Sequence, residues 1–162
     1  MTPSVATTAI VLFTRTPGEE ARAKRFLRGH HRQTNARVAR HLIRHAEQTA
    51  RTSGLPVYVI DSALQRGTTF GERLRHAFED VFAIGYEAVI AIGNDTLGLQ
   101  TGDLHQARTL LGMHDTVVGP TSAGGTYLIG MRGEDYRADE IAALPWETPI
   151  LCRSLLAAFS AI

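Results

Sequence analysis

Residues 88–99 read Ala-Val-Ile-Ala-Ile-Gly-Asn-Asp-Thr-Leu-Gly-Leu, and this stretch decides the fold. Its first five residues are apolar and rich in β-branched side chains, and Gly93 ends the run. This pattern predicts a strand buried on both faces, as in a parallel sheet covered by helices. Because ligands bind at the carboxyl ends of strands in open α/β sheets, Asp95 is a candidate ligand for a divalent cation. Asn-Asp-Thr after a strand is also typical of a turn or a helix cap.

Strands and helices are expected to alternate along the whole chain. Apolar runs predict strands over residues 9–14, 57–61, 88–92, 116–119 and 126–131, the last of which is expected to return antiparallel. Apolar side chains spaced by three or four residues predict helices over 19–27, 35–53, 69–82, 103–111 and 150–159. Thr69 and Glu72 fit a capping box, while Thr148 and Pro149 fit the N-cap and first turn of the last helix. The order predicts a three-layer α/β fold with a mostly parallel sheet flanked by helices.

The composition is that of a soluble globular protein. We expect one domain over residues 1–162, because a chain of this length can bury a sizeable core. No apolar run reaches the roughly 20 residues that a membrane span needs. The apolar start lacks a leading Lys or Arg, which favours a first strand over a signal peptide. The single Cys152 excludes an internal disulfide, so a cytoplasmic location is expected.

Charge is unevenly distributed along the chain. Residues 1–51 carry a net charge of +7 and residues 52–162 a net charge of −6, within a total of +1. A basic half of this kind suits a phosphate-bearing ligand, a solvated helix face or nucleic acid. Nucleic acid ranks last, because residues 22–51 lack interleaved aromatic side chains and any known binding module. His41 and His45 have a spacing at which two imidazoles can share a metal, but a surface pair is the stronger expectation without a third ligand nearby.

Five short motifs, in this order, resemble a bacterial glycosyltransferase-A-like family of unknown function. They are Phe13-Thr-Arg-Thr-Pro-Gly18 with Lys24-Arg25-Phe26, Gly71-Glu-Arg-Leu-Arg-His-Ala-Phe78, Ile92-Gly-Asn-Asp-Thr-Leu-Gly-Leu99, Val118-Gly-Pro-Thr-Ser-Ala-Gly-Gly-Thr-Tyr-Leu-Ile-Gly130 and Pro145-Trp-Glu-Thr148. That family is related to nucleotide-diphospho-sugar transferases and to phospholactate guanylyltransferases. The resemblance implies a Rossmann-like sheet of the nucleotide-diphospho-sugar transferase kind, with a nucleotide held over the loop after the first strand.

The resemblance also assigns expected roles to single residues. The nucleotide loop would be formed by Arg15, Thr16, Pro17 and Gly18. Lys24 and Arg25 would face phosphate, and Asp95 would hold Mg²⁺ or Mn²⁺. Gly124 and Gly125 would let the backbone approach an acceptor or a sugar. Asp95 and Lys24 are therefore the candidate catalytic residues.

The sequence departs from the family pattern near these positions. Ala123 stands where relatives usually have an acid before the double glycine, neutral Asn94 and Thr96 flank Asp95, and Leu97 replaces a proline. Two functions consequently stay open. One is a metal-dependent nucleotidyl- or glycosyltransferase acting on a nucleoside-diphosphate-sugar-type donor, in which charge on the diphosphate is neutralised without a covalent nucleophile. The other is a relative that binds a nucleotide or sugar phosphate without turnover.

Two further residues, Asp61 and Trp146, each have two interpretations, and two others, Glu72 and Cys152, have a structural one. Asp61 can contact a ribose or cap a turn, and Trp146 can belong to the core or pack at the rim of the site. Glu72 is expected to serve the capping box, and Cys152 is expected to be structural. An exposed patch at the short C-terminal helix leaves a homodimer open.

Overall fold

The computed structural model describes residues 7–24, 26–29 and 31–159, and it has a mixed sheet at its centre. The strand order is β2 (Val57–Ile60), β1 (Thr8–Phe13), β3 (Ala88–Ile92), β5 (Thr126–Arg132) and β4 (Thr116–Pro120). β1 pairs in parallel with β2 and β3, whereas β5 pairs antiparallel with both β3 and β4. Of these strands only β5 runs against the others, which confirms the mostly parallel sheet and its antiparallel return.

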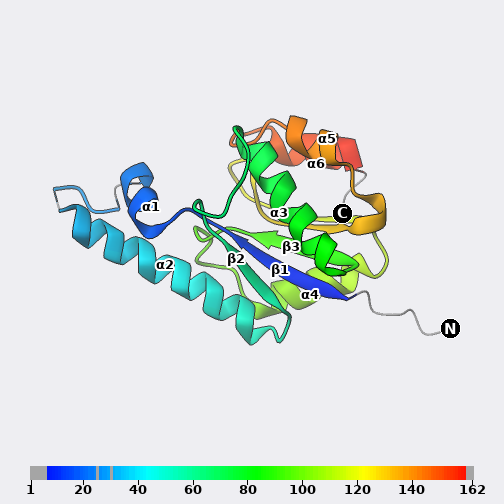
Figure 1. Cartoon of the computed structure of the whole chain (residues 1–162), viewed down its shortest axis with the longest axis horizontal. Helices are drawn as coiled ribbons and strands as arrows, with labels where there is room; N and C mark the ends of the chain where they lie inside the picture. Colours follow the sequence, from blue (N-terminus) through cyan, green and yellow to red (C-terminus); the bar gives the residue numbers. More distant parts are fainter. Residues whose placement is uncertain (1–6, 25, 30, 160–162) are drawn as a thin grey trace.

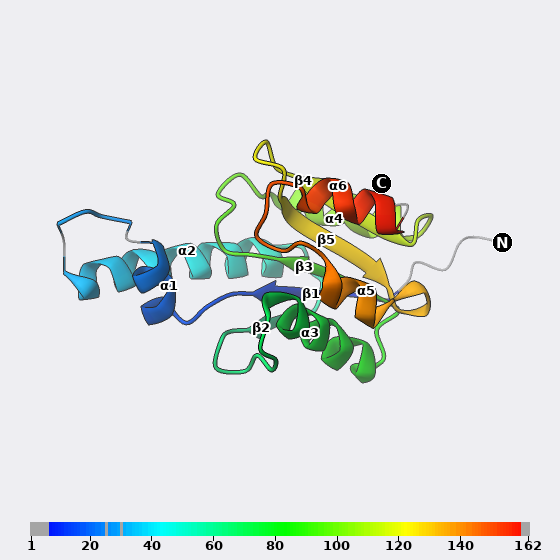
Figure 2. The same ribbon diagram turned by 90° about the horizontal axis from the view of Figure 1, so that it is seen from above.

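Helices cover both faces of the sheet. α2 (Arg32–Thr52) and α4 (Thr101–Leu111) lie on one face, and α3 (Phe70–Ile84), α5 (Ala138–Ala143) and α6 (Leu151–Phe159) lie on the other (Figures 1 and 2). α1 (Pro17–Lys24) packs against α2, and the short η1 (Gly133–Asp135) follows β5. The three-layer α/β architecture is therefore confirmed. None of the helices in the described ranges is long and apolar enough to span a bilayer.

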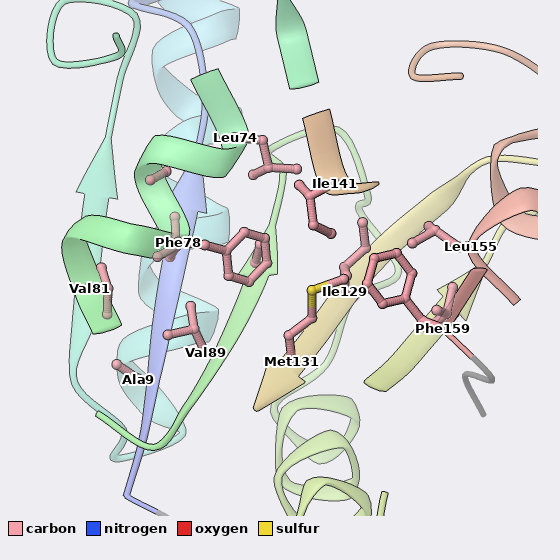
Figure 3. Close-up of a cluster of buried hydrophobic side chains, with 14 of the residues drawn as sticks. Ala9, Leu74, Phe78, Val81, Val89, Ile129, Met131, Ile141, Leu155 and Phe159 are labelled. Atoms are coloured by element: carbon pink, nitrogen blue, oxygen red, sulfur yellow. The ribbon is translucent and has the colours of Figure 1, made fainter. Parts of the chain in front are cut away.

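The strands separate two hydrophobic cores. Alternate residues of β1 face opposite sides, so Ala9 and Val11 join the core under α3, α5 and α6 (Figure 3). Ile10 and Leu12 join the core under α2 and α4. All five residues of β3 are buried, because β3 lies inside the sheet and is covered on both faces. The burial predicted from the apolar run 88–92 is thus confirmed.

Local signals account for several helix ends. The hydroxyl of Thr69 accepts from the backbone N–H of Glu72 at 3.1 Å, and the Glu72 carboxylate accepts from the N–H of Thr69 at 3.1 Å. This is the predicted capping box. Gly85 then ends α3 with φ 117°, a left-handed conformation that glycine adopts without steric cost.

Other helix predictions need correction. α1 begins at Pro17, because the fixed φ of proline suits the first helical position, and α2 begins at Arg32 instead of residue 35. α5 was not predicted. The N-cap position assigned to Thr148 and the first-turn position assigned to Pro149 are wrong, because the helix starts two residues after Pro149. The Thr148 hydroxyl donates to the Pro145 carbonyl at 2.6 Å. α6 begins at Leu151, and the next N–H, that of Cys152, is satisfied instead by the Gly124 carbonyl at 3.0 Å.

Candidate functional site

A cavity of about 1050 Å³ opens at the carboxyl ends of β1 and β3. These two strands are parallel neighbours, so the loops that follow them meet at one edge of the sheet. α1, the start of α3, the β4–β5 loop and residues 146–149 complete the wall. The lining of the cavity includes the side chains of Arg15, Lys24, Gln65, Phe70, Arg73, Asp95, Trp146 and Glu147.

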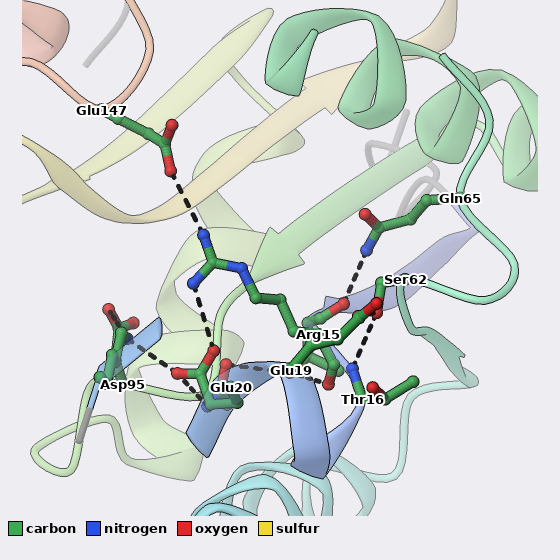
Figure 4. Close-up of polar contacts among 11 residues, drawn as sticks. Arg15, Thr16, Glu19, Glu20, Ser62, Gln65, Asp95 and Glu147 are labelled. Atoms are coloured by element: carbon green, nitrogen blue, oxygen red, sulfur yellow. Dashed lines mark hydrogen bonds and ion pairs between the residues drawn. The ribbon is translucent and has the colours of Figure 1, made fainter. Parts of the chain in front are cut away.

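A nearly buried carboxylate organises one end of this cavity. Glu20, on α1, has a side chain that is only 3% exposed. Its Oε1 lies 2.9 Å from Lys24 Nζ, and its Oε2 lies 3.5 Å from Arg15 Nη1 (Figure 4). Lys24 Nζ also lies 3.1 Å from Oδ2 of Asp95, so the ammonium bridges two carboxylates. Arg15 in turn reaches Oε1 of Glu147 at 3.8 Å.

Asn94 ties this cluster to the ends of both central strands. Its buried side chain accepts from the Thr14 hydroxyl at 3.0 Å and donates to Glu20 Oε1 at 3.3 Å. Thr14 follows β1 and Asn94 follows β3, so one amide links both strand ends to α1. These hydrogen bonds fix Glu20 in place. They also occupy the side-chain oxygen of Asn94 with a partner from the protein itself.

The surroundings of Lys24 change its acidity. Desolvation lowers the pKa of the Lys24 ammonium, but hydrogen bonds and Coulombic attraction to Glu20 and Asp95 outweigh it. The net effect raises the pKa above the ordinary value for lysine, so this side chain stays protonated at neutral pH. Lys24 therefore acts as a fixed positive charge and cannot serve as a base there.

The structure brings together the two candidate catalytic residues. Asp95 lines the cavity and contacts Lys24, although 71 positions separate them in the sequence. The Asp95 side chain is 64% exposed, so its second oxygen is open to the cavity. Lys24 and Asp95 therefore lie side by side at the cavity wall, and their roles in catalysis stay a prediction.

The donor set at Asp95 fits a divalent cation only with help from a ligand. No group of three or more His, Cys, Asp or Glu suited to a metal occurs among the described residues. Glu20, the other carboxylate that Lys24 contacts, already binds Lys24 and Arg15. Mg²⁺ commonly takes one or two carboxylates and completes its shell with water and phosphate oxygens. Asp95 meets that minimal requirement when a diphosphate supplies the other oxygens.

The predicted nucleotide loop is only partly at the cavity. Arg15 lines it, whereas Thr16, Pro17 and Gly18 do not. α1 begins at Pro17, and the part of it that lines the cavity starts at Glu19. The Thr16 N–H donates to Ser62 Oγ at 2.9 Å, which closes this loop on the protein itself. Arg25 lies outside the described residues.

The hydrogen bond from Ser62 also acts on Glu19. The Ser62 hydroxyl donates to the Glu19 carboxylate (Figure 4). This bond holds the pKa of Glu19 below its usual range, although desolvation opposes it. Glu19 thus braces the loop as a carboxylate.

The two glycines of the β4–β5 loop have different surroundings. Gly125 lines the cavity, as expected, but Gly124 does not. Gly124 has φ 86°, and a Cβ there would collide with the carbonyl of Pro149. Gly124 therefore permits close packing of its loop against the chain before α6, and the approach that it allows is to Pro149 and not to a ligand.

Aromatic side chains form the other end of the cavity. Phe70 packs edge-on against Phe13 and tilted against Trp146, each with ring centroids 5.4 Å apart. Trp146 Nε1 donates to the Ile141 carbonyl at 2.7 Å, and its ring packs so closely on Gly71 that a Cβ there would lie 2.8 Å from it. Trp146 is thus half-buried. It lines the cavity and also packs against the core under α3, α5 and α6, so it has features of both interpretations, core residue and rim residue.

Sequence reasoning missed several cavity residues. Glu20 could have been found from its i,i+4 spacing to Lys24, because such pairs meet on a helix surface. Arg73 and Glu147 lie within two of the five motifs, but the resemblance assigned them no role. Gln65 carries no local signal that separates it from surface polar residues. Glu147 has a positive φ of 61°, which is unusual for a residue with a side chain.

The remaining candidates lie elsewhere. Asp61 does not line the cavity, and its Oδ1 accepts from the Ala63 N–H at 2.9 Å, so the turn-cap interpretation is confirmed. His41 and His45 are exposed on α2. Cys152 is half-buried on α6 and packs against the core under α3, α5 and α6.

The three-layer α/β fold of this chain is also found in a solved structure. The crystal structure of a proposed nucleotide-diphospho-sugar transferase from Desulfovibrio desulfuricans G20 superimposes with a TM-score of 0.80, covering 94% of this chain and 75% of that chain at 22% identity. At this identity the likeness shows the fold. The chain belongs to the family of uncharacterized proteins conserved in bacteria (DUF2064), which matches residues 27–148. No curated protein matches it. The family expected from the five motifs is therefore confirmed.

Proposed function

We propose that the protein is a metal-dependent nucleotidyl- or glycosyltransferase that takes a nucleoside-diphosphate-sugar-type donor in the cavity at the ends of β1 and β3. The observation that carries this proposal is the bridge that Lys24 Nζ forms between Glu20 and Asp95 at the cavity wall. The fold that this chain shares with a proposed nucleotide-diphospho-sugar transferase supports it.

The charges of the cluster explain why a metal belongs to the proposal. Three carboxylates, Glu20, Asp95 and Glu147, face two cations, Arg15 and Lys24, so the cluster carries a formal charge of −1. A diphosphate would be repelled by that net charge. A divalent cation on Asp95 reverses the sign and makes the cluster attractive to phosphate.

Each residue of the cluster then has a distinct task. Asp95 would hold Mg²⁺ or Mn²⁺, which would neutralise charge on the diphosphate leaving group. Lys24 supplies a fixed positive charge, because its raised pKa keeps it protonated. Glu20 positions Lys24, and Asn94 holds Glu20 in place. Arg15 exchanges Glu147 for a phosphate oxygen, since Glu147 is weakly held at 3.8 Å.

A relative that binds without turnover is the second candidate. Ala123 lines the cavity in the loop before Gly125 and offers no acid or base there. A bound nucleotide would then be held by Arg15 and Lys24 and would not react.

A thermal-shift experiment separates these functions. Nucleoside diphosphates and nucleotide sugars are added to the protein with Mg²⁺, with Mn²⁺ or with EDTA. We expect stabilisation that requires metal and is lost in Asp95→Asn but kept in Asp139→Asn, a matched carboxylate on α5 that is fully exposed and away from the cavity. Equal stabilisation in EDTA would favour the binding protein, and a flat response to all nucleotides would overturn both functions.

A further inference from the structure

The cavity contains an arginine whose charge no carboxylate of the described residues compensates. Four cationic side chains line the cavity, namely Arg15, Arg22, Lys24 and Arg73. Arg15 and Lys24 each contact two carboxylates, and Arg22 lies on the exposed side of α1 near Glu19. Within the described ranges, no carboxylate lies within 4.0 Å of the Arg73 guanidinium.

The side chain of Arg73 is covered at its stem and open at the cavity. Its Nε is buried and has no hydrogen-bond partner. Arg75, Arg108 and Arg132 share this feature, but none of them lines the cavity, and Arg75 and Arg132 each have a carboxylate partner. Arg73 is the one member of this group whose remaining guanidinium nitrogens can meet a cavity ligand. A half-buried cation without a counter-charge is costly, and an anion in the cavity would offset that cost.

The neighbours of Arg73 fit an organic ligand that carries this anion. Phe70, one helical turn before Arg73, and Trp146 form an apolar wall. Both N–H groups of the Gln65 amide are used, donating to the Thr14 carbonyl at 2.7 Å and the Ile60 carbonyl at 3.1 Å. This arrangement leaves only the Gln65 oxygen as an acceptor for a hydroxyl or N–H group of a ligand.

We propose that Arg73 binds a carboxylate or phosphate group of the second substrate, the acceptor, at a subsite separate from the cluster around Lys24. α1, which carries Lys24, and α3, which carries Arg73, lie apart in both ribbon views (Figures 1 and 2). The word acceptor rests on the proposed function, whereas anion binding by Arg73 rests on the cavity alone. Charge-assisted hydrogen bonds from a guanidinium to two oxygens would give such a group both affinity and orientation.

Tryptophan fluorescence provides a direct readout. Trp146 is the only tryptophan of the chain. Its ring packs on Gly71, which lies in the first turn of α3, two residues before Arg73. Glycerate and glycerol 3-phosphate are titrated at constant ionic strength, with glycerol as the neutral control. We expect a saturable change with at least one anion and none with glycerol, and the anion that binds identifies the acceptor as a carboxylate or a phosphate ester.

Two variants test the assignment. Arg73→Gln should weaken anion binding by about tenfold or more, because a charged hydrogen-bonding partner is lost. Arg108→Gln is the matched control, an arginine with the same unpartnered Nε that lies outside the cavity, and it should leave binding unchanged. If Arg73→Gln is unstable, Arg73→Lys retains charge and stem and should weaken binding less than a folded, charge-free Arg73→Met.

The outcomes separate this inference from the proposed function. Unchanged anion affinity in Arg73→Gln, or equal loss in Arg108→Gln, would overturn the role of Arg73. So would a wild type that binds neither anion. Metal-dependent stabilisation by nucleotides, measured on the same Arg73→Gln protein, reports on the cluster at Asp95 and should persist. Arg73-dependent anion binding without any nucleotide response would support the Arg73 subsite while overturning the transferase.

Discussion

The two ends of the cavity differ in whether their cationic side chains are paired with carboxylates. At the cluster end, Arg15 and Lys24 are bound by carboxylates, of which Glu20 is almost fully buried. At the aromatic end, Arg73 stands beside Phe70 and Trp146 without a carboxylate partner in the described chain. Cations that are paired with carboxylates can keep their geometry without a ligand, whereas a cation without a carboxylate partner is available to bind an anionic ligand. The first end is therefore built for positioning, and the second for recognition.

The largest effect is expected from the centre of the cluster. Glu20→Gln removes the negative charge that faces Arg15 and Lys24. We expect the free energy of unfolding to fall by about 2–3 kcal/mol. This is somewhat less than for a fully buried pair, because both cations are partly exposed. Urea denaturation measures this change. Glu134→Gln, whose exposed carboxylate pairs with Arg132, should cost below about 1 kcal/mol. Equal costs in the two variants would mean that Glu20 does not organise its end.

The aromatic end can be broken through its tightest contact. A Cβ at Gly71 would collide with the Ala142 carbonyl and lie 2.8 Å from Trp146, so Gly71→Ala should lower the free energy of unfolding by about 1–3 kcal/mol and shift Trp146 fluorescence. Gly102→Ala, in the first turn of α4 with open space around it, should instead stabilise by about 0.5 kcal/mol. A silent Gly71→Ala would show that Trp146 is not held against α3.

A smaller effect is expected at the helix start that carries the aromatic end. Thr69→Ala removes the hydroxyl that accepts from the Glu72 N–H and should cost about 1 kcal/mol in thermal or urea unfolding. Thr69→Ser keeps the hydroxyl and should restore most of the stability. If Ser and Ala behave alike, the capping box contributes nothing measurable to α3.

The smallest stability effect is expected at Asp95, because its side chain is 64% exposed. Asp95→Asn should change the free energy of unfolding by less than about 0.5 kcal/mol. It should nevertheless lower the pKa of Lys24, since Asp95 contributes to its rise. Lys24 is the only lysine of the chain, so selective isotope labelling of lysine lets NMR follow it without overlap.

The sign of the Lys24 contribution follows from the raised pKa. A lysine whose folded pKa lies above its unfolded value stabilises the fold fully below that unfolded value, and this stability is lost as the pH rises through the folded pKa. The contribution of Lys24 should therefore be lost only in strongly alkaline solution, above the ordinary lysine value of 10.5. A Lys24 resonance that titrates at or below 10.5 would contradict the bridge between Glu20 and Asp95.

Local sequence signals predicted the elements that depend on neighbouring residues. The apolar run 88–92 and the capping box at Thr69 both appear where expected, because burial of a strand and capping of a helix involve residues a few positions apart. The start of α6 was misjudged, because the Cys152 N–H finds its partner at Gly124, 28 residues away. Likewise, the need for glycine at 124 comes from Pro149 and not from a ligand.

The sequence by itself determined the alternation of strands and helices, the family and the position of Asp95 after the central strand. The folded chain alone reveals that Glu20 also contacts Arg15, and that Arg73 lines the same cavity with no carboxylate partner among the described residues. The physical reason is that periodicity and capping act over one or two turns, whereas charge compensation depends on which distant segments the sheet and its loops bring within a few ångströms.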